Sequence, residues 1–319
     1  MGLFGQLFGQ DREKVVPELL PAIERAVSAV EPRLMQTSGY PGSYRKPVST
    51  ALEYSRNLAA SIPGPVAVNR KSYARDALVH ALFPSVDFVV EALCTSCALQ
   101  DYHREFPATD ELYALMGMRR YEKTMMGMEL SGEMIQRDVV QKAVYFTSHT
   151  IEDPAPSEEQ ARDSAAWSFF DCLARKVKKR IEARKQDKQS LLQEKDVLMA
   201  RLRSTDAGGR PALEEELSRM MAALQTTTRS LELHNYLEDF EAVLLNPGQH
   251  LRLDRVPIVL DSMGIRRENG DADREEAVVF NELIGFDRRN WTVAMVHCSN
   301  MQSESFSTRL DKAYRRLAI

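Results

Sequence analysis

The stretch from Trp167 to Leu245 constrains the fold most, because two long helical patterns there flank a short turn sequence at residues 204–210. Stepping by three and four residues from Trp167 traces a heptad stripe that lasts for about five repeats. The stripe contains Trp167, Phe170, Ala174, Val177, Ile181, Arg184, Lys188, Leu191, Lys195, Leu198 and Leu202. It is apolar at both ends and basic in the middle.

The returning pattern begins at Pro211, which suits the start of a helix because the first N–H groups of a helix lack an intrahelical partner. Its stripe runs through Leu213, Leu217, Met220, Leu224, Thr227 and Leu231, then shifts phase to Leu233, Leu237, Phe240 and Leu244. A turn centred near Ala207 places Leu202 opposite Leu213 and Leu191 opposite Leu224. The sequence therefore predicts an antiparallel coiled-coil hairpin.

Charge supports this pairing, since residues 167–205 carry a net charge of +6 and residues 211–245 carry −5. The cations within the stripe, Arg184, Lys188 and Lys195, have two interpretations. Their long side chains pass along a stripe that is half exposed to water, or carboxylates of a partner protein or of a second copy meet them. With Arg180 and Lys185, they form the predicted partner-binding set.

Strand signals lie on both sides of the hairpin. Residues 129–135 read as strand, turn and strand, and residues 139–151 are rich in Val, Tyr, Phe and Thr. Further strand signals occupy residues 250–256, 258–266, 277–286 and 291–298. Because an antiparallel hairpin returns its ends to one place, we predict an α+β fold: a mostly helical chain whose coiled-coil hairpin is inserted into a small antiparallel β-sheet domain.

The predicted organisation has four parts. They are an amphipathic segment at residues 1–10, a helical region at 11–120, a β-rich domain formed by 121–156 plus 246–319, and the inserted hairpin at 157–245. Within the helical region, one long pattern runs from Ser72 to Gln100 with an interruption at Pro84. A short amphipathic helix over residues 305–317 is expected to close the chain.

Composition is that of an ordinary globular protein, with 44% hydrophobic and 28% charged residues. The net charge of −4 gives no general attraction to nucleic acid. No apolar run approaches the length of a membrane span, and no secretory signal is visible. We therefore expect a cytoplasmic protein, with a peripheral position at the inner face of a membrane as an extension of that expectation.

The first ten residues, MGLFGQLFGQ, would place Leu3, Phe4, Leu7 and Phe8 on one face of a helix. Three occupants of that face are open: the body of the protein itself, a membrane surface, or a partner's groove. Gln6 stands where N-myristoylation requires Ser or Thr, so the resemblance to that motif fails.

Motifs for catalysis or metal binding are weak. Ser43 to Lys46 matches S-x-x-K without its companion motifs. Cys94 and Cys97 lack further ligands at zinc spacing, and we interpret them as buried structural thiols. Asp271 and Asp273 lack the rest of a calcium loop. We expect no cofactor and no metal.

These observations favour a non-catalytic interaction or scaffold protein that docks partner proteins through the hairpin, with a homo-oligomer as a further possibility. A nucleic-acid-binding protein using the basic outgoing arm is one alternative. An enzyme whose site is assembled from distant residues is another, and His149 and His297, at the ends of strands expected to be adjacent, are the positions to inspect.

Overall fold

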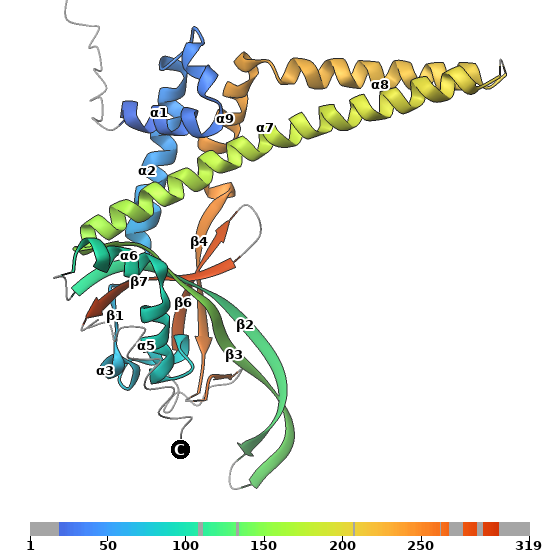
Figure 1. Cartoon of the computed structure of the whole chain (residues 1–319). Coiled ribbons are helices and arrows are strands. Elements are labelled where there is room, and N and C mark those ends of the chain that lie inside the picture. The colour runs from blue at the N-terminus through green and yellow to red at the C-terminus, as the bar shows by residue number, and fades with distance from the viewer. Residues whose placement is uncertain are drawn as a thin grey trace, which may run out of the picture. The chain divides into compact units, whose positions relative to one another are not determined.

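The computed structural model describes residues 19–107, 111–131, 134–206, 208–261, 263–267, 277–285 and 290–299. Helices and strands are mixed, as predicted. Contacts divide the chain into two units, and Figure 1 shows the helices and strands of both. Unit 1 comprises residues 1–53 and 170–247, and unit 2 comprises residues 54–169 and 248–319. The predicted segment with Leu3, Phe4, Leu7 and Phe8, the acidic loop at 268–276 and the helix at 305–317 lie outside the described residues.

Unit 1 is helical. Its elements are α1 (Leu19–Val30), the 3-10 turns η1 (Pro32–Gln36) and η2 (Gly42–Tyr44), the start of α2 (Arg45–Ser61), α7 (Glu158–Ser204) from Phe170 onward, α8 (Arg210–Ser230), η3 (Leu233–Asn235) and α9 (Tyr236–Leu244). The inward-facing residues of these helices form a core that includes Ile23, Val27, Phe170, Val177 and Phe240. The ring of Tyr44 packs edge-on against Phe240, with centroids 5.0 Å apart.

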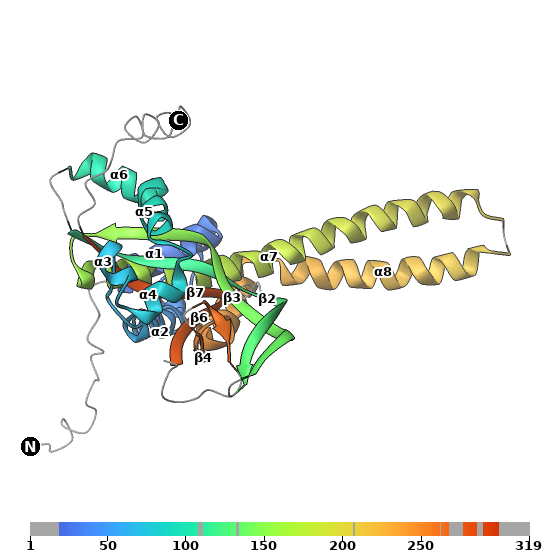
Figure 2. The ribbon, with the colours of Figure 1, turned by 90° about the horizontal axis from the view of Figure 1, so that it is seen from below.

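The two predicted hairpin helices are present, and α8 runs back in the direction opposite to α7 (Figure 2). α8 has no buried residue, and beyond Ile181 only Leu198 is buried in α7 among the described positions. The half-covered residues of α8 are Leu213, Leu217, Met220, Leu224, Thr227 and Ser230, so the stripe faces inward but remains accessible. Coiled-coil packing of the pair stays a prediction.

The phase shift after Leu231 is a break between helices, and the returning pattern is not one continuous helix to Leu245. α8 ends at Ser230, and α9 begins at Tyr236 after the short η3 turn. The Asn235 side chain donates a hydrogen bond to the Arg229 carbonyl at 2.7 Å, which ties the two sides of the break together.

Unit 2 contains one seven-stranded sheet. Its strands are β1 (Val66–Val68), β2 (Glu111–Ser131), β3 (Met134–Ala155), β4 (Leu251–Val259), β5 (Ile265–Arg266), β6 (Ala277–Gly285) and β7 (Asn290–Ser299). The order is β4-β6-β7-β2-β3-β5, with β1 added parallel to β7. Strands from both sides of the hairpin thus join one sheet, as predicted.

The sheet nearly closes on itself. β5 pairs with β3 at Ala143 and Lys142, and a bridge between Leu260 and Arg266 links β5 back to the end of β4. The predicted strand at 258–266 is broken there, because the Asp261 carboxylate accepts hydrogen bonds from the Met263 and Ile265 amides. Gly264 adopts a φ of 75°, which suits glycine.

Four short helices pack on the inner face of this sheet: α3 (Arg70–Tyr73), α4 (Ala77–Leu82), α5 (Val86–Thr95) and α6 (Cys97–Glu105). They share one core with the sheet, which includes Leu82 and Leu99 of the helices and Met116, Phe146 and Val296 of the strands. The sequence pattern predicts one helix interrupted once. The chain is broken more often because Asn69, Asp76, Ser85 and Ser96 each cap a new helix through a side-chain oxygen.

β2 begins at Glu111, ten residues before the start of the predicted β-rich region, and forms a long hairpin with β3. The register shifts three times, and each time β3 carries the extra residue. Asp138, Ser148 and Asp153 lie at these shifts with φ of 59°, 54° and 48°. Bulges of this kind bend a strand and increase its twist, which accounts for the curved hairpin in Figure 1.

Candidate interaction surfaces

The predicted partner-binding cations lie on α7 and have carboxylates of their own chain as neighbours. Arg184 and Arg180 both pair with Asp239 of α9, a carboxylate whose side chain is only 4% exposed. Arg184 also donates a hydrogen bond to the Ser230 carbonyl at 3.1 Å. Burial, followed by the charge of Arg180, lowers the pKa of Arg184. These ion pairs hold the middle of α7, at Arg180 and Arg184, against α9.

The other cations of the set are more loosely held. Lys185 lies 3.6 Å from Glu31, and Lys195 lies 3.3 Å from its exposed neighbour Asp196. Lys188 is half-buried on the stripe. Their contact with a partner stays a prediction. Lys188 and Lys195 are the best placed for it, because they lie beyond Arg184, where α7 is paired with α9.

Glu31 of unit 1 forms a two-point ion pair with Arg33. Both of its oxygens accept hydrogen bonds from the Arg33 guanidinium, at 2.8 and 3.0 Å. The hydrogen bond from Arg33 is the main reason that the pKa of Glu31 falls to about 2, with burial opposing the shift and Lys185 adding to it.

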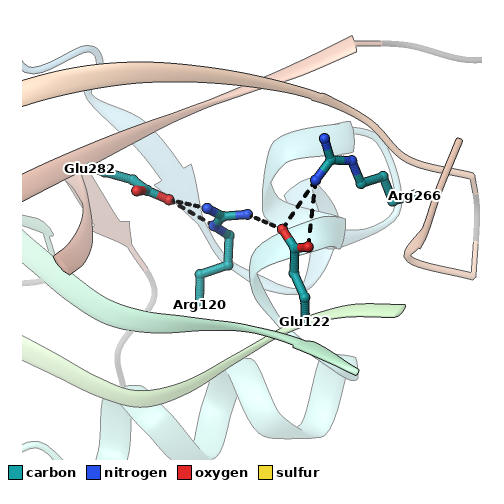
Figure 3. Close-up of polar contacts among 4 residues, drawn as sticks. All are labelled: Arg120, Glu122, Arg266 and Glu282. Atoms are coloured by element: carbon teal, nitrogen blue, oxygen red, sulfur yellow. Dashed lines mark hydrogen bonds and ion pairs between the residues drawn. The ribbon is translucent and has the colours of Figure 1, made fainter. Parts of the chain in front are cut away.

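A ladder of alternating charges crosses unit 2 where the long hairpin leaves the sheet (Figure 3). Arg120 of β2 donates to Glu282 of β6 at 2.7 Å and to Glu122 at 2.5 Å. Glu122 in turn lies 3.4 Å from Arg266 of β5. Each cation meets a carboxylate, so the ladder is neutral as a whole. It joins three strands and leaves no unpaired charge among these four residues for a substrate.

Beyond the ladder, the hairpin carries exposed apolar side chains on both faces. We call residues 119–131 of β2 with residues 134–145 of β3 the ribbon. Directly paired residues of antiparallel strands share a face, so Met126 and Val140 lie on the face that carries the buried Phe146 and Val144. They are 66% and 61% exposed. The other large exposed apolar residues of the ribbon are Tyr121, Met125, Met128, Met134, Ile135 and Tyr145.

Gly127 holds a special position in the ribbon. A Cβ there would lie 1.9 Å from Oε1 of Gln141, whose side chain crosses over it. Nε2 of Gln141 donates to the Met128 carbonyl at 3.1 Å, and Gln141 is buried as a result. The glycine thus allows a polar clamp between the two strands near the bulge at Asp138.

The two histidines singled out for an enzyme site are not brought together. His149 is on β3 and His297 is on β7, and β2 lies between these strands. Nε2 of His149 bonds to the Leu82 carbonyl at 2.8 Å while its ring stacks on Phe83. Burial lowers the pKa of His149. His297 stacks on Tyr113, with centroids 4.7 Å apart. His149 acts as a packing group, and Nε2 of His297 also lies 3.5 Å from a carboxylate oxygen of Glu111.

The cysteines also differ from expectation. Cys97 is exposed and Cys94 half-buried, so the interpretation as a pair of buried thiols is wrong. Cys97 opens α6 directly after its Ser96 cap, and the break between α5 and α6 turns it outward. Cys298 is fully buried, and burial raises its pKa to about 12. The described residues contain no group of side chains with the composition of a metal site.

The described part of unit 2 has a pocket of about 450 Å³ lined by Gly248, Gln249, Leu251, Arg252, Ile284, Gly285 and Asn290. Its only charged member is Arg252, which already contacts Asp254 at 3.2 Å. A general acid and base cannot be assembled from these side chains.

Comparison of the chain with protein-family profiles, with characterised proteins and with solved structures finds no match. Among the described helices, none is long and apolar enough to cross a bilayer. The exposed apolar surface of the ribbon was missed from sequence, because Met125, Met126 and Met128 lie in a segment with strand signals and the sequence does not show which of its residues the sheet leaves uncovered.

Proposed function

We propose that this chain is a non-catalytic interaction protein that docks partner proteins through the helical arm, which we define as residues 182–204 of α7 together with α8. The observation that carries the proposal is the incomplete burial of the arm's stripe. Leu213, Leu217 and Leu224 are spaced for a coiled coil yet only half-covered, and α8 buries none of its residues. Apolar residues at this spacing gain stability when another helix covers them.

The chemistry of the stripe indicates the kind of partner. A partner helix that binds along the arm would form a coiled coil with α7 and α8. It would meet leucines near the turn and the cations Lys188 and Lys195 near the middle. An amphipathic helix with carboxylates flanking its apolar stripe fits this pattern, because burial of each cation then comes with a counter-charge.

Chemical cross-linking and pull-down from the native host test the proposal with two charge-matched variants. Leu217→Glu/Leu224→Glu places charge on the stripe, whereas Met221→Glu/Thr228→Glu places the same charge, at the same spacing, on exposed positions. We expect the first variant to lose specific partners and the second to keep them. Partners that persist with both variants, or vanish with both, contradict docking through the stripe.

The alternative function is nucleic-acid binding by the basic face of α7. Its central cations Arg180 and Arg184 already meet Asp239, which favours the protein partner. A steep fall in DNA or RNA affinity with rising salt would reverse this preference.

A further inference from the structure

The ribbon of unit 2 has one open edge. β7 pairs with β2 only as far as Met118, and no described strand pairs with the β7-facing edge of β2 beyond that residue. The β3 edge is different, since β5 pairs with it at Ala143 and Lys142 and the Asp138 bulge interrupts it further out. Bulges and charges protect an edge from pairing with another strand. The open edge of β2 has neither a described partner nor a bulge of its own.

The side chains beside that edge are unusually apolar for a surface strand. Met125, Met126 and Met128 are all exposed, with Met126 and Met128 at 66%. Methionine side chains are flexible and adapt to varied contacts, so they suit a surface that another protein covers. A two-stranded ribbon is also marginally stable alone and gains from a third strand.

The sequence of the edge is complementary to itself. Residues 123–129 read Lys-Thr-Met-Met-Gly-Met-Glu. If two such strands pair antiparallel about Met126, position 123 of each faces position 129 of the other, so a lysine position meets a glutamate position twice. Met125 then faces Gly127, over which the Gln141 side chain of the same chain lies, and Met126 faces its own copy. A two-fold interface requires this kind of self-complementarity.

We propose that the β2 edge of the ribbon binds the same edge of a second copy of this chain, which forms a two-fold dimer through a continuous β-sheet. A bilayer is a poorer occupant, because the edge sequence 123–129 begins and ends with a charged residue and charged side chains are costly to insert. This inference concerns a different unit from the helical arm and stands independently of the proposed function.

The first test is the mass of the full chain in solution, measured by light scattering and sedimentation equilibrium. We expect twice the chain mass for the native protein and for the control Met263→Asp, an exposed site outside the ribbon. We expect the monomer mass for Met126→Asp. A native protein that stays monomeric up to about 100 µM, or a dimer that tolerates Met126→Asp, overturns the proposal.

Charge exchange tests the register. Lys123→Glu and Glu129→Lys should each weaken the dimer roughly tenfold, because two ion pairs become two repulsions. The double variant should restore the native dissociation constant. Equal weakening by both single variants and the double variant contradicts this pairing.

A disulfide test fixes the axis. At the centre of an antiparallel pair the Cα atoms lie about 4.5–5.5 Å apart, which is within disulfide range. In a Cys97→Ser background, Met126→Cys should oxidise to a covalent dimer much faster than Met263→Cys. Equal rates overturn the assignment. Cosedimentation with phosphatidylserine-containing vesicles that depends on Met126 would also overturn it, and would assign the ribbon to a membrane instead.

Discussion

At the scale of single residues, the buried and half-buried titratable groups described above stabilise the fold through ion pairs, hydrogen bonds and ring stacking. Asp239 pairs with two arginines, Glu31 binds Arg33 through both oxygens, and the His149 ring stacks on Phe83. Sequence analysis identified Arg184 as one of three cations in the heptad stripe. Sequence analysis could not identify Asp239 as the partner of Arg184. Asp239 lies on α9, whose position depends on the break after α8, and the sequence shows that break only as a phase shift of the stripe.

The Glu31 carboxylate should make stability depend on acid pH. Its folded pKa of about 2 lies below the ordinary value of 4.5. Its contribution is therefore complete above pH 4.5 and is lost as the pH falls through about 2. We expect Glu31→Gln to lower the free energy of unfolding by about 1 kcal/mol at pH 7, since the pair is partly screened by water, and to have little effect near pH 2.

Urea unfolding at several pH values measures this difference. Glu24→Gln, at an exposed position of α1, is the matched control and should leave stability nearly unchanged at every pH. An equal loss for Glu31→Gln at pH 7 and pH 2 would show that the carboxylate charge is not the source of the effect.

His149 should produce a second pH dependence, in a higher range. Burial keeps its folded pKa below the ordinary 6.5, so the neutral ring is favoured in the fold. Stability is complete above pH 6.5 and falls as the unfolded chain takes up a proton below it. His149→Gln retains a donor for the Leu82 carbonyl but does not titrate.

We expect His149→Gln to lose about 1 kcal/mol at pH 7 with its ring stacking and to have a flatter stability profile between pH 6.5 and 5. Denaturant titrations across this range provide the measurement. The exposed His234→Gln serves as control and should keep the native slope. An unchanged slope for His149→Gln would assign the pH dependence to another group.

At the scale of elements, periodicity predicted the long helices, the β-hairpin and the joining of strands from both sides of the insertion. It did so because a single side-chain period dominates each of those segments. The four short helices between Arg70 and Glu105 were merged into one pattern, since their caps act within a few residues and leave the apolar spacing intact. The three bulges of β3 were not predicted, because each depends on one residue's backbone conformation.

The charge ladder gives a prediction for the sheet. Glu282 is buried, with only 8% of its side chain exposed, and Arg120 is its described counter-ion. Removal of one partner of a buried pair leaves an uncompensated charge, which costs about 3–5 kcal/mol. We expect Arg120→Met to destabilise unit 2 by this amount, and Arg120→Met/Glu282→Leu to recover most of it.

The matched control is Arg266→Met, because this arginine is the more exposed end of the same ladder. It should cost less than about 1 kcal/mol. Thermal unfolding with calorimetry distinguishes the variants, and equal losses for Arg120→Met and Arg266→Met would show that burial of Glu282 does not set the energy.

At the scale of the whole molecule, the contact of the predicted partner-binding set with a partner stays a prediction. The heptad pattern located the arm correctly, because its stripe is the less exposed side of both helices. The second exposed surface, the ribbon, was not recognised, since register and bulges decide which of its residues project beyond the sheet. Sequence alone gives neither.

The described part of the arm beyond its base contributes little to the core, and this can be measured. Between Gln186 and Thr227 the only buried described residue is Leu198. We expect replacement of residues 186–227 by a short Gly/Ser linker to leave a cooperatively folded protein whose unfolding temperature changes by only a few degrees. Arg184, Asp239 and Ser230 remain in this variant.

Circular dichroism and calorimetry check the result, with Leu173→Asp in the core of unit 1 as the contrasting variant that should unfold it. Loss of the cooperative transition on shortening the arm would mean that the arm stabilises the protein as well as presenting a surface.

The placement of all three bulges on β3 has a consequence for the number of chains that can assemble. A ribbon that could pair on both edges would add copies without limit and grow into a fibre. With Asp138 interrupting one edge, addition stops once the other edge is satisfied. A few residues in left-handed conformation would thus limit the assembly to a finite stoichiometry and keep a methionine-rich strand from polymerising.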